Sequence, residues 1–474
     1  MEFTIVSKQL TVATAIIFIT PFYLTLNNRN AFAEAIRYEP NWDSLDSRPL
    51  PDWYDEGKIG IFIHWGVFSV PSFSSEWFWY HWQGPKKWKA IEDFMAKNYP
   101  PDWTYADFAQ QFVTPTGIYN PRHWAEVFNA SGARYVVQVT KHHEGFTSWP
   151  SKYSFNWNSM DVGPKRDLVG DLAAEVRKFP NLRYGVYHSL FEWFNPVYLE
   201  DEANNYTTQN FPFTKSLPEL YELVNTYKPD IIWSDGCPST DTYWNSTHFL
   251  AWLYNDSPVK DTVVTNDRWG ANCICKHGGF LTCTDQYNPG TLSKRKFENC
   301  LKLDFQSWGY RRDMKLSEVI SIEKLLQTVV KTISCNGNIL INIGPTKDGT
   351  IPVIFEERLR QLGTWLAVNG EAVYYSRPWG HQNDTVTKNI WYTLRPDLKA
   401  VYAFVFDWPE IQLLLGAVVP SAATEITLLG SYTQQFQWVY TQGQGLTIRI
   451  PAIPFNEMPC DWLWVFRITN VSNW

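Results

Sequence analysis

The sequence predicts an α/β domain followed by an all-β domain. Up to about residue 380, short apolar runs typical of buried strands alternate with stretches whose apolar residues recur at helical spacing. From about Thr385 onward, short alternating strands follow one another with no helical stripe between them. The 474 residues are also too many for one small core. We therefore expect one domain over residues 34–380 and a β-sandwich over residues 381–474.

The N-terminus has the pattern of a secretory signal peptide. An apolar run from Leu10 to Leu26 follows Lys8, and Ala31-Phe-Ala33 has the small-x-small form of a cleavage site. A membrane anchor is the alternative, but Pro21 interrupts the run and no later segment has about 18 consecutive apolar residues. We expect residues 1–33 to be removed, which leaves a lumenal or secreted product.

Asn-x-Ser/Thr sequons fit passage through a glycosylating pathway, although such triplets also arise by chance. They begin at Asn129, Asn205, Asn245, Asn255, Asn383 and Asn470.

Composition narrows the class of ligand. The net charge is -7 and no basic cluster is present, which argues against nucleic acid or an anionic membrane as partner. Aromatic residues make up 17% of the chain, with 25 Trp. Flat aromatic faces suit the apolar faces of sugars as well as ordinary cores, so a neutral substrate fits better than a charged one.

Most of the expected strands of the first domain end in polar side chains. The strands are predicted at residues 58–66, 135–145, 182–189, 227–236, 262–270 and 338–344. Helices are predicted at residues 121–133, 168–179, 217–227, 247–254 and 316–333, and a closing helix ends at Gly370. Ser216-Leu-Pro-Glu219 has the form of a capping box. Catalytic groups of strand–helix–strand proteins gather in the loops at the carboxyl ends of the strands, so the site is expected there.

Asp235 is the first candidate for chemistry. Pro229 ends the preceding helix, Ile231 to Trp233 have the character of a buried strand, and Gly236 follows the carboxylate. The alternative role is that of an Asp capping a turn.

The strand at 135–145 has the most polar end, with Lys141, His142, His143 and Glu144. Adjacent histidines on a regular strand point to opposite faces, so they are a poor chelating pair. Hydrogen bonding to a polyol is the better functional interpretation, and a structural role is the alternative.

Cysteines gather in a loop of the first domain. Cys273, Cys275, Cys283 and Cys300 lie close together in a chain that has seven cysteines. With His277 they are a possible zinc site, but the oxidising compartment favours disulfides that pin the loop.

The sequence contains neither of the two common glycine-rich phosphate-binding loops and no G-x-S-x-G motif. The usual sequence signals of nucleotide-binding proteins and of serine esterases are therefore missing. Glycoside hydrolysis needs two carboxyl groups in a pocket that binds hydroxyls, and this chain has the residues to supply them.

Six motifs stand in order along the chain: His64-Trp-Gly66, Lys141-His-His-Glu-Gly145, Trp233-Ser-Asp-Gly236, Asn266-Asp-Arg-Trp-Gly270, Ser307-Trp-Gly-Tyr310 and Asn342-Ile-Gly-Pro-Thr-Lys-Asp-Gly349. Together they resemble the α-L-fucosidases of glycoside hydrolase family 29, in the animal lysosomal or secreted branch. The resemblance implies a (β/α)8-like barrel followed by a β-sandwich. It also implies release of terminal α-L-fucose from glycans with retention of configuration, without metal or organic cofactor.

The resemblance also assigns residues. It implies that Asp235 is the nucleophile and Glu298 the acid/base, with Glu144 and Glu192 as rivals for the second role. The implied fucose-binding residues are His64, Glu76, Trp77, His142, His143, Tyr187, Trp233 and Arg268. The segment Cys237-Pro-Ser-Thr240 departs from the animal pattern, which leaves the leaving-group preference open.

Two other functions remain alternatives: a catalytically silent fucose-binding recognition protein, and a glycosidase of the same fold for another sugar. The expected partners are fucosylated glycans, and we expect a homo-oligomer in the lysosome or outside the cell.

Overall fold

The computed structural model describes residues 36–114, 117–236, 238–431 and 435–474. By its contacts the chain divides into residues 1–37 and a compact unit of residues 38–474. The expected signal peptide and Cys237 lie outside the described residues. None of the helices in the described part of the chain combines the length and the apolar character needed to cross a bilayer.

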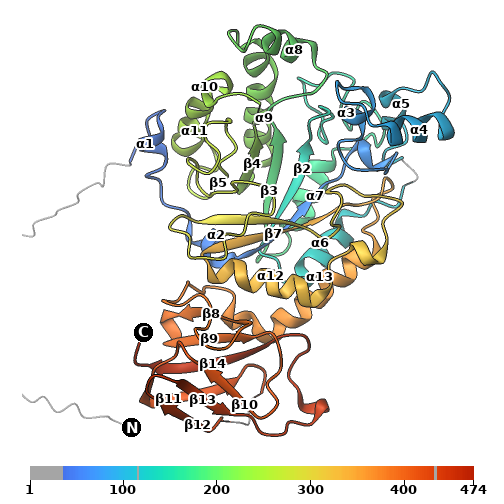
Figure 1. Cartoon of the computed structure of the whole chain (residues 1–474). Helices are drawn as coiled ribbons and strands as arrows, with labels where there is room; N and C mark the ends of the chain where they lie inside the picture. Colours follow the sequence, from blue (N-terminus) through green and yellow to red (C-terminus); the bar gives the residue numbers. More distant parts are fainter. Residues whose placement is uncertain (1–35, 115–116, 237, 432–434) are drawn as a thin grey trace, which may run out of the picture. The chain divides into compact units, whose positions relative to one another are not determined.

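A parallel sheet of seven strands forms the centre of the first domain (Figure 1), in the order β5-β4-β3-β2-β1-β7-β6. Its strands are β1 Ile59–Ile63, β2 Tyr135–Lys141, β3 Arg183–Ser189, β4 Ile231–Asp235, β5 Val264–Thr265, β6 Phe297–Lys302 and β7 Gly337–Ile343. Every neighbouring pair is parallel, so all seven carboxyl ends lie at one edge.

A short segment between β5 and β6 closes the sheet. Phe280 N donates to Thr265 O of β5 at 3.1 Å, and Leu281 forms a parallel bridge with Phe297 of β6. The segment therefore occupies the eighth position of the ring. This confirms the expected (β/α)8-like barrel.

Alternate residues of the strands face two separate cores. Phe62 of β1 and Leu340 of β7 belong to the cluster inside the barrel. Ile61, Ile63 and Ile341 belong to the larger cluster between the sheet and the helices. Both faces are buried, which explains why the strands are nearly continuous apolar runs.

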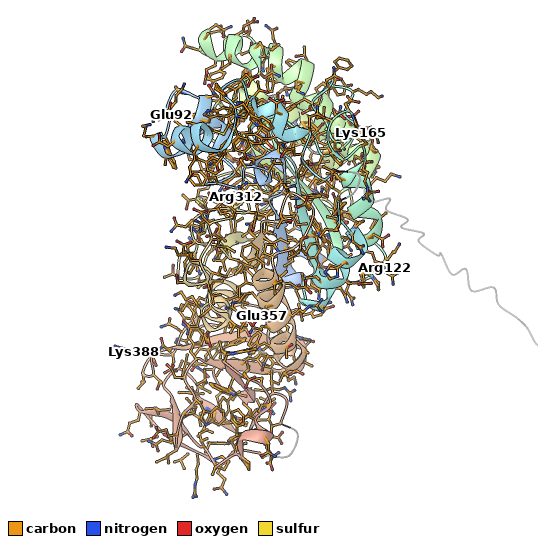
Figure 2. The ribbon with its side chains drawn as sticks, turned by 90° about the vertical axis from the view of Figure 1, so that its right-hand side faces the viewer. Glu92, Arg122, Lys165, Arg312, Glu357 and Lys388 are labelled. Carbon is orange, nitrogen blue, oxygen red and sulfur yellow. A yellow bond between two sulfur atoms is a disulfide. The ribbon has the colours of Figure 1, made fainter. Side chains whose placement is uncertain are left out.

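The barrel helices lie outside the sheet (Figure 1). The longer ones are α6 Pro121–Ala130, α7 Leu168–Val176, α9 Leu217–Tyr227, α11 Ser246–Asn255, α12 Ile322–Ser334 and α13 Val353–Asn369. The others are α1 Trp42–Leu45, α2 Asp52–Gly57, α3 Phe78–Gln83, α4 Lys89–Asn98, α5 Tyr105–Ala109, α8 Pro196–Ala203 and α10 Asp241–Trp244. Charged side chains such as Arg122 of α6 and Glu357 of α13 lie at the outer surface (Figure 2).

The predicted capping box at Ser216 is wrong. Ser216 is already helical, with φ -64° and ψ -49°, because a π-helical turn at Pro212–Ser216 precedes α9. Its side chain makes no cap, and the Glu219 carboxylate instead pairs with Lys141 Nζ at 2.7 Å. Glu219, which the sequence pattern assigned to the capping box, therefore forms a buried ion pair.

The C-terminal domain consists of two antiparallel sheets, as a β-sandwich requires. The larger has the order β11-β14-β9-β8, and the smaller β10-β13-β12. The strands are β8 Ile390–Arg395, β9 Ala400–Val405, β10 Gln412–Leu415, β11 Pro420–Leu428, β12 Trp438–Thr441, β13 Gly445–Arg449 and β14 Trp464–Val471. Trp365 Nε1 of α13 donates to Leu463 O at 2.8 Å, which joins this domain to the barrel directly.

Candidate active site

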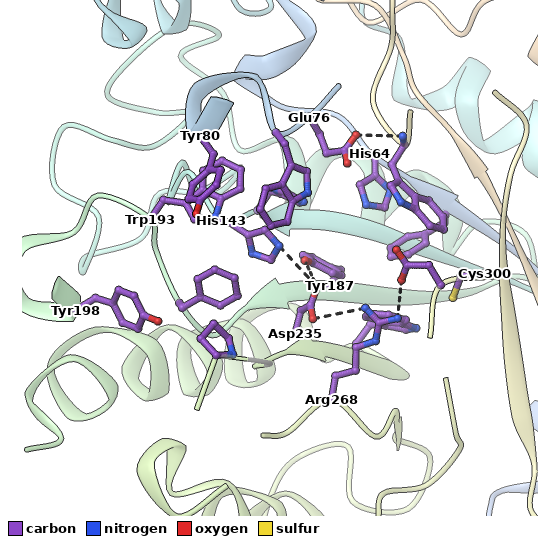
Figure 3. A pocket seen from close by; sticks show the side chains of 18 of the residues that line it. His64, Glu76, Tyr80, His143, Tyr187, Trp193, Tyr198, Asp235, Arg268 and Cys300 are labelled. Atoms are coloured by element: carbon purple, nitrogen blue, oxygen red, sulfur yellow. Dashed lines mark hydrogen bonds and ion pairs between the residues drawn. The ribbon is translucent and has the colours of Figure 1, made fainter. Parts of the chain in front are cut away.

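Asp235 is the last residue of β4 and projects into a cavity at the carboxyl edge of the sheet. Tyr187 Oη donates to its Oδ2 at 2.9 Å. Arg268 Nη1 lies 3.6 Å from its Oδ1, and His143 Nε2 lies 3.8 Å from its Oδ2. Figure 3 shows these three side chains converging on the carboxylate. The structure therefore places Asp235 beside a hydroxyl donor and a guanidinium, which stabilise a carboxylate and which a simple turn cap would not need.

The cavity has a volume of about 570 Å³ and is lined by every predicted fucose-binding residue. These are His64, Glu76, Trp77, His142, His143, Tyr187, Trp233 and Arg268, together with Asp235. They come from the ends of several different strands and from the turn before α3. The structure thus brings together nine of the ten residues that the sequence assigned to the site.

His142 and His143 both line the cavity, so the expectation that they face opposite sides is wrong. β2 ends at Lys141, and the two histidines lie in the turn that follows. Their ring centroids are 4.1 Å apart. The strand rule does not apply beyond the last strand residue.

The hydrogen bonds of His143 fix its tautomer. Ser189 Oγ donates to Phe191 O at 2.7 Å, so the 2.7 Å contact with His143 Nδ1 requires Nδ1 to carry the proton. Burial lowers the pKa of His143 well below its ordinary value. The ring is therefore neutral. Its Nε2 carries no proton and is a hydrogen-bond acceptor, 3.8 Å from Asp235 Oδ2.

His64 has the same arrangement. Its Nδ1 lies 2.6 Å from Asn342 Oδ1, while the Asn342 amide nitrogen donates to Trp308 O at 2.7 Å. Burial lowers the pKa of His64 well below its ordinary value. Two neutral histidines thus present acceptor nitrogens to the cavity, as recognition of hydroxyl groups requires.

Glu76 is a buried carboxylate whose hydrogen-bonding partners lie in residues 307–309. Its Oε2 accepts from Ser307 Oγ at 3.1 Å and from the backbone N–H groups of Trp308 and Gly309 at 3.1 and 3.2 Å. These three hydrogen bonds all go to Oε2, and none to Oε1 is found among the described residues. Trp77 packs edge-on against His143, with ring centroids 5.5 Å apart.

Trp233 forms an aromatic floor below Asp235. Its ring stacks on Tyr187 at 5.6 Å, and the Arg268 guanidinium lies 4.8 Å from its centroid. Its Nε1 donates to Glu298 Oε1 at 3.0 Å. The Glu298 carboxylate therefore holds the Trp233 ring from the side opposite the cavity.

Glu298 is the one predicted site residue that the structure does not bring to the cavity. It lies in strand β6 and not in the cysteine-rich loop, and its side chain is completely buried. Its Oε2 accepts from Tyr54 Oη at 2.9 Å and from Tyr135 Oη at 2.6 Å. Burial raises the pKa of Glu298. The register explains the position, because Glu298 pairs with Asn338 near the start of β7, away from the carboxyl ends.

Asp285 is a cavity residue that the sequence analysis missed. Its side chain is 52% exposed, lines the cavity and pairs with Arg268 Nη2 at 2.6 Å. It follows Cys283, which forms a disulfide with Cys275, and Asp267 Oδ2 accepts from the backbone nitrogens of both cysteines. The loop is therefore fixed in place next to Asp285. The cysteines that fix it were the sequence signal that could have pointed to this residue.

The disulfide confirms part of the cysteine interpretation. It uses two of the thiols that the zinc alternative needs, while Cys273 and Cys300 are buried and form no disulfide with another described residue. Within the described residues, no cluster of three or more His, Cys, Asp or Glu side chains is placed to hold a metal ion.

Glu144 and Glu192, the rivals for the acid/base role, line a different cavity. Glu192 pairs with Lys141 Nζ at 3.0 Å and Lys215 Nζ at 3.4 Å.

Comparison with known proteins gives the family. Residues 25–371 match the family model described as Alpha-L-fucosidase, and residues 382–469 match the Alpha-L-fucosidase C-terminal domain. An alpha-L-fucosidase of Branchiostoma floridae is 56% identical over 437 residues, covering 92% of this chain and 96% of the relative. The plasma alpha-L-fucosidase of Homo sapiens is 55% identical over 442 residues, covering 92% and 93%.

A solved structure agrees with this. The crystal structure of the Thermotoga maritima alpha-fucosidase in complex with a mechanism-based inhibitor superposes with a TM-score of 0.77 at 30% identity, covering 92% of this chain and all of that one. Since both domains match their family models and animal relatives share over half of the aligned residues, the chain belongs to the α-L-fucosidase family.

Proposed function

We propose that the cavity is the active site of a retaining exo-glycosidase that releases terminal α-L-fucose from fucosylated glycans, with Asp235 as the nucleophile. The observation that carries this is the position of Asp235, at a strand end inside a cavity whose other polar groups face it. The geometry favours a reacting group over a turn residue. A ring of neutral acceptors, one guanidinium and aromatic faces suits a small, uncharged sugar.

The reaction is a double displacement. Asp235 forms a bond to the anomeric carbon while the bond from that carbon to the leaving oxygen breaks and a general acid protonates that oxygen. The same group then takes a proton from water as the water oxygen displaces Asp235. Two inversions at one carbon give net retention.

For the general acid we propose Asp285 in place of Glu298. Proton transfer requires the acid to reach the leaving oxygen at hydrogen-bond distance. Asp285 is exposed to the cavity and contacts the same guanidinium as Asp235. Glu298 lies beneath Trp233, with all three of its donors in the barrel interior. Its proposed role is to hold the Trp233 ring.

The remaining residues would bind the sugar. His64 and His143 offer Nε2 as acceptors for ring hydroxyls, and Glu76 offers Oε1. Arg268 donates to oxygens and offsets the charge of Asp235 and Asp285. Trp77 and Trp233 would shield the site from water and contact the methyl group of fucose.

A panel of aryl glycosides assayed with purified protein tests this function. We expect turnover of the aryl α-L-fucoside and no turnover of the corresponding galactoside, glucoside or mannoside. Fucose binding without release would support the silent recognition protein. Release from another glycoside would support a glycosidase for a different sugar.

The origin and processing of the chain are further proposals. We propose removal of residues 1–33, delivery to the lysosome or the outside of the cell, a domain boundary near residue 380 and assembly as a homo-oligomer. The signal-like N-terminus and the similarity to a plasma relative support the secretory route.

A further inference from the structure

A second cavity, of about 700 Å³, opens next to the first and is not used by the proposed reaction. Helix α3, the start of α5 and the turns that follow β2 and β3 surround it. Its walls are mainly aromatic, and include Trp79, Trp103, Tyr105, Trp157 and Phe194. This cavity also contains Glu144, whose carboxylate the sequence singled out and the first cavity does not use.

Three polar atoms at this cavity are buried without a hydrogen bond. They are Trp103 Nε1, Tyr105 Oη and Glu144 Oε2, which have no hydrogen-bonding partner among the described residues. Tyr105 is 3% and Glu144 5% exposed. His142 Nδ1 lies 3.4 Å from Glu144 Oε2 and makes no hydrogen bond with it. Unsatisfied buried polar groups are costly, so three of them at one cavity indicate a ligand that satisfies them.

The aromatic walls are rigid. The rings of Trp79 and Tyr105 are stacked at 4.3 Å with an angle of 4° between their planes, and Phe194 packs on Trp79 at 4.4 Å. Trp157 Nε1 donates to Glu144 O at 2.9 Å, which ties one wall to the residue that carries the buried carboxylate. The cavity is therefore preorganised, and a ligand would find its contact surfaces already in place.

The charges at its edge neutralise one another. Glu192 contacts Lys215 Nζ at 3.4 Å and Lys141 Nζ at 3.0 Å, and Lys215 also pairs with Glu219 at 3.0 Å. Of the described residues that line this cavity, Lys215 is the cation, and its charge is paired with Glu192 and Glu219, whereas the Glu144 carboxylate would repel an anion. A neutral ligand fits this arrangement.

The three unsatisfied groups define the chemistry of that ligand. An indole N–H donates, a carboxylate accepts, and a phenol does both. The ligand must therefore donate and accept hydrogen bonds while it presents an apolar face to aromatic rings. A pyranose sugar has hydroxyl groups and a C–H face, whereas a hydrocarbon chain would leave the polar atoms unsatisfied.

We propose that this second cavity binds a neutral pyranose sugar, separately from the sugar in the first cavity. Neighbouring residues line opposite sides of the wall between the two. Trp79 and Phe194 face the second cavity, whereas Tyr80 and Trp193 face the first. The two sites are thus one layer of side chains apart, and each has its own hydrogen-bonding groups.

The test uses N-acetyllactosamine, a neutral disaccharide without fucose, in the presence of excess L-fucose to fill the first cavity. Saturation-transfer NMR and titration calorimetry would measure its binding to the full chain and to Tyr105→Phe. This change removes only the buried hydroxyl. We expect Tyr105→Phe to weaken binding about fivefold, since one hydrogen bond is lost. Its melting temperature should be unchanged or higher, because an unsatisfied buried group is removed.

Tyr119→Phe is the matched control. Tyr119 Oη is equally buried and unsatisfied among the described residues, but it does not line the second cavity. It should leave binding unchanged. Absence of saturation transfer, or equal binding by Tyr105→Phe and the wild type, would overturn the inference. If L-fucose abolished binding of the disaccharide, the disaccharide would bind in the first cavity, and this result would also overturn the inference. Failure of the aryl fucoside assay would instead affect only the proposed function.

Discussion

Asp235 and Asp285 contact the same guanidinium group. Asp235 Oδ1 lies 3.6 Å from Nη1 of Arg268, and Asp285 Oδ1 lies 2.6 Å from Nη2. One side chain from the end of a barrel strand and one from the disulfide-pinned loop are therefore held at the same small region of the cavity. A nucleophile and a general acid that act on one bond need such an arrangement.

The role of Asp285 is tested by leaving-group dependence. Asp285→Ala should slow hydrolysis of fucosides with poor leaving groups by roughly 10²–10⁴-fold, because those leaving oxygens need the proton. Activated aryl fucosides should lose far less in the bond-breaking step. Steady-state rates over a series of leaving groups would show a steeper dependence than the wild type. Equal losses across the series would remove Asp285 from the acid role.

Glu298→Gln tests the role of the buried carboxylate. The amide keeps one acceptor oxygen but turns an N–H toward donors, so at least one of Tyr54, Tyr135 and Trp233 is left unsatisfied. The free energy of unfolding should fall by about 1–3 kcal/mol. Activity should fall by a similar factor for good and poor leaving groups, because only the position of Trp233 changes. A loss confined to poor leaving groups, with full stability, would make Glu298 the acid.

The buried His188 predicts acid sensitivity of the fold. Its Nε2 contacts Glu219 at 3.0 Å, with Lys141 and Lys215 close to the same carboxylate. Burial, reinforced by the Lys141 charge, lowers the pKa of His188 to about 4. An unfolded histidine has a pKa of about 6.5. Between these values only the unfolded chain binds the proton, so stability is lost as pH falls from about 6.5 toward 4.

His188→Gln keeps an N–H donor for Glu219 but cannot titrate. Melting temperatures from pH 7 to pH 4.5 should therefore fall less steeply for this variant than for the wild type. The remaining slope would come from other buried histidines such as His64 and His143, whose pKa values are also lowered by burial. Parallel slopes for the two proteins would contradict the assignment.

The sequons should not be occupied equally. Asn255 Nδ2, the atom that would carry a glycan, donates to Tyr38 O at 2.8 Å, while its Oδ1 accepts from Tyr38 N. Asn129, Asn205, Asn383 and Asn470 are exposed. Mass spectrometry of glycopeptides from secreted protein should therefore find Asn255 unmodified and glycans at exposed sites. A glycan at Asn255 would show that its hydrogen bonds with Tyr38 do not protect the amide from modification.

Most of the barrel could be predicted from sequence because its strands are local patterns. Ile231 to Trp233 followed by Asp235 indicated both a buried strand and a functional carboxyl end. The closing segment at Phe280 and Leu281 could not be predicted, because it is held by one hydrogen bond to β5 and one bridge to β6 and has no strand pattern of its own.

The position of Glu298 outside the first cavity has a physical cause. Its neighbour Cys300 suggested a place in the cysteine-rich loop, but Cys300 belongs to the barrel interior and forms no disulfide within the described part of the chain. Which carboxylate reaches a cavity depends on strand register and on how a loop returns. A short sequence motif specifies neither property. For the same reason the sequence did not indicate Asp285.

The central claim, that Asp235 is the nucleophile of a retaining reaction, is tested most directly by Asp235→Gly with added azide. The variant alone should lose several orders of magnitude in turnover of an aryl α-L-fucoside, because the covalent route is removed. Azide should enter the space left by the carboxylate, restore part of the rate and give the β-L-fucosyl azide, since one displacement inverts the anomeric carbon. Product configuration can be read by NMR. An α-configured azide, or no rescue together with β-L-fucose as the first sugar released by the wild type, would show that Asp235 is not a covalent nucleophile.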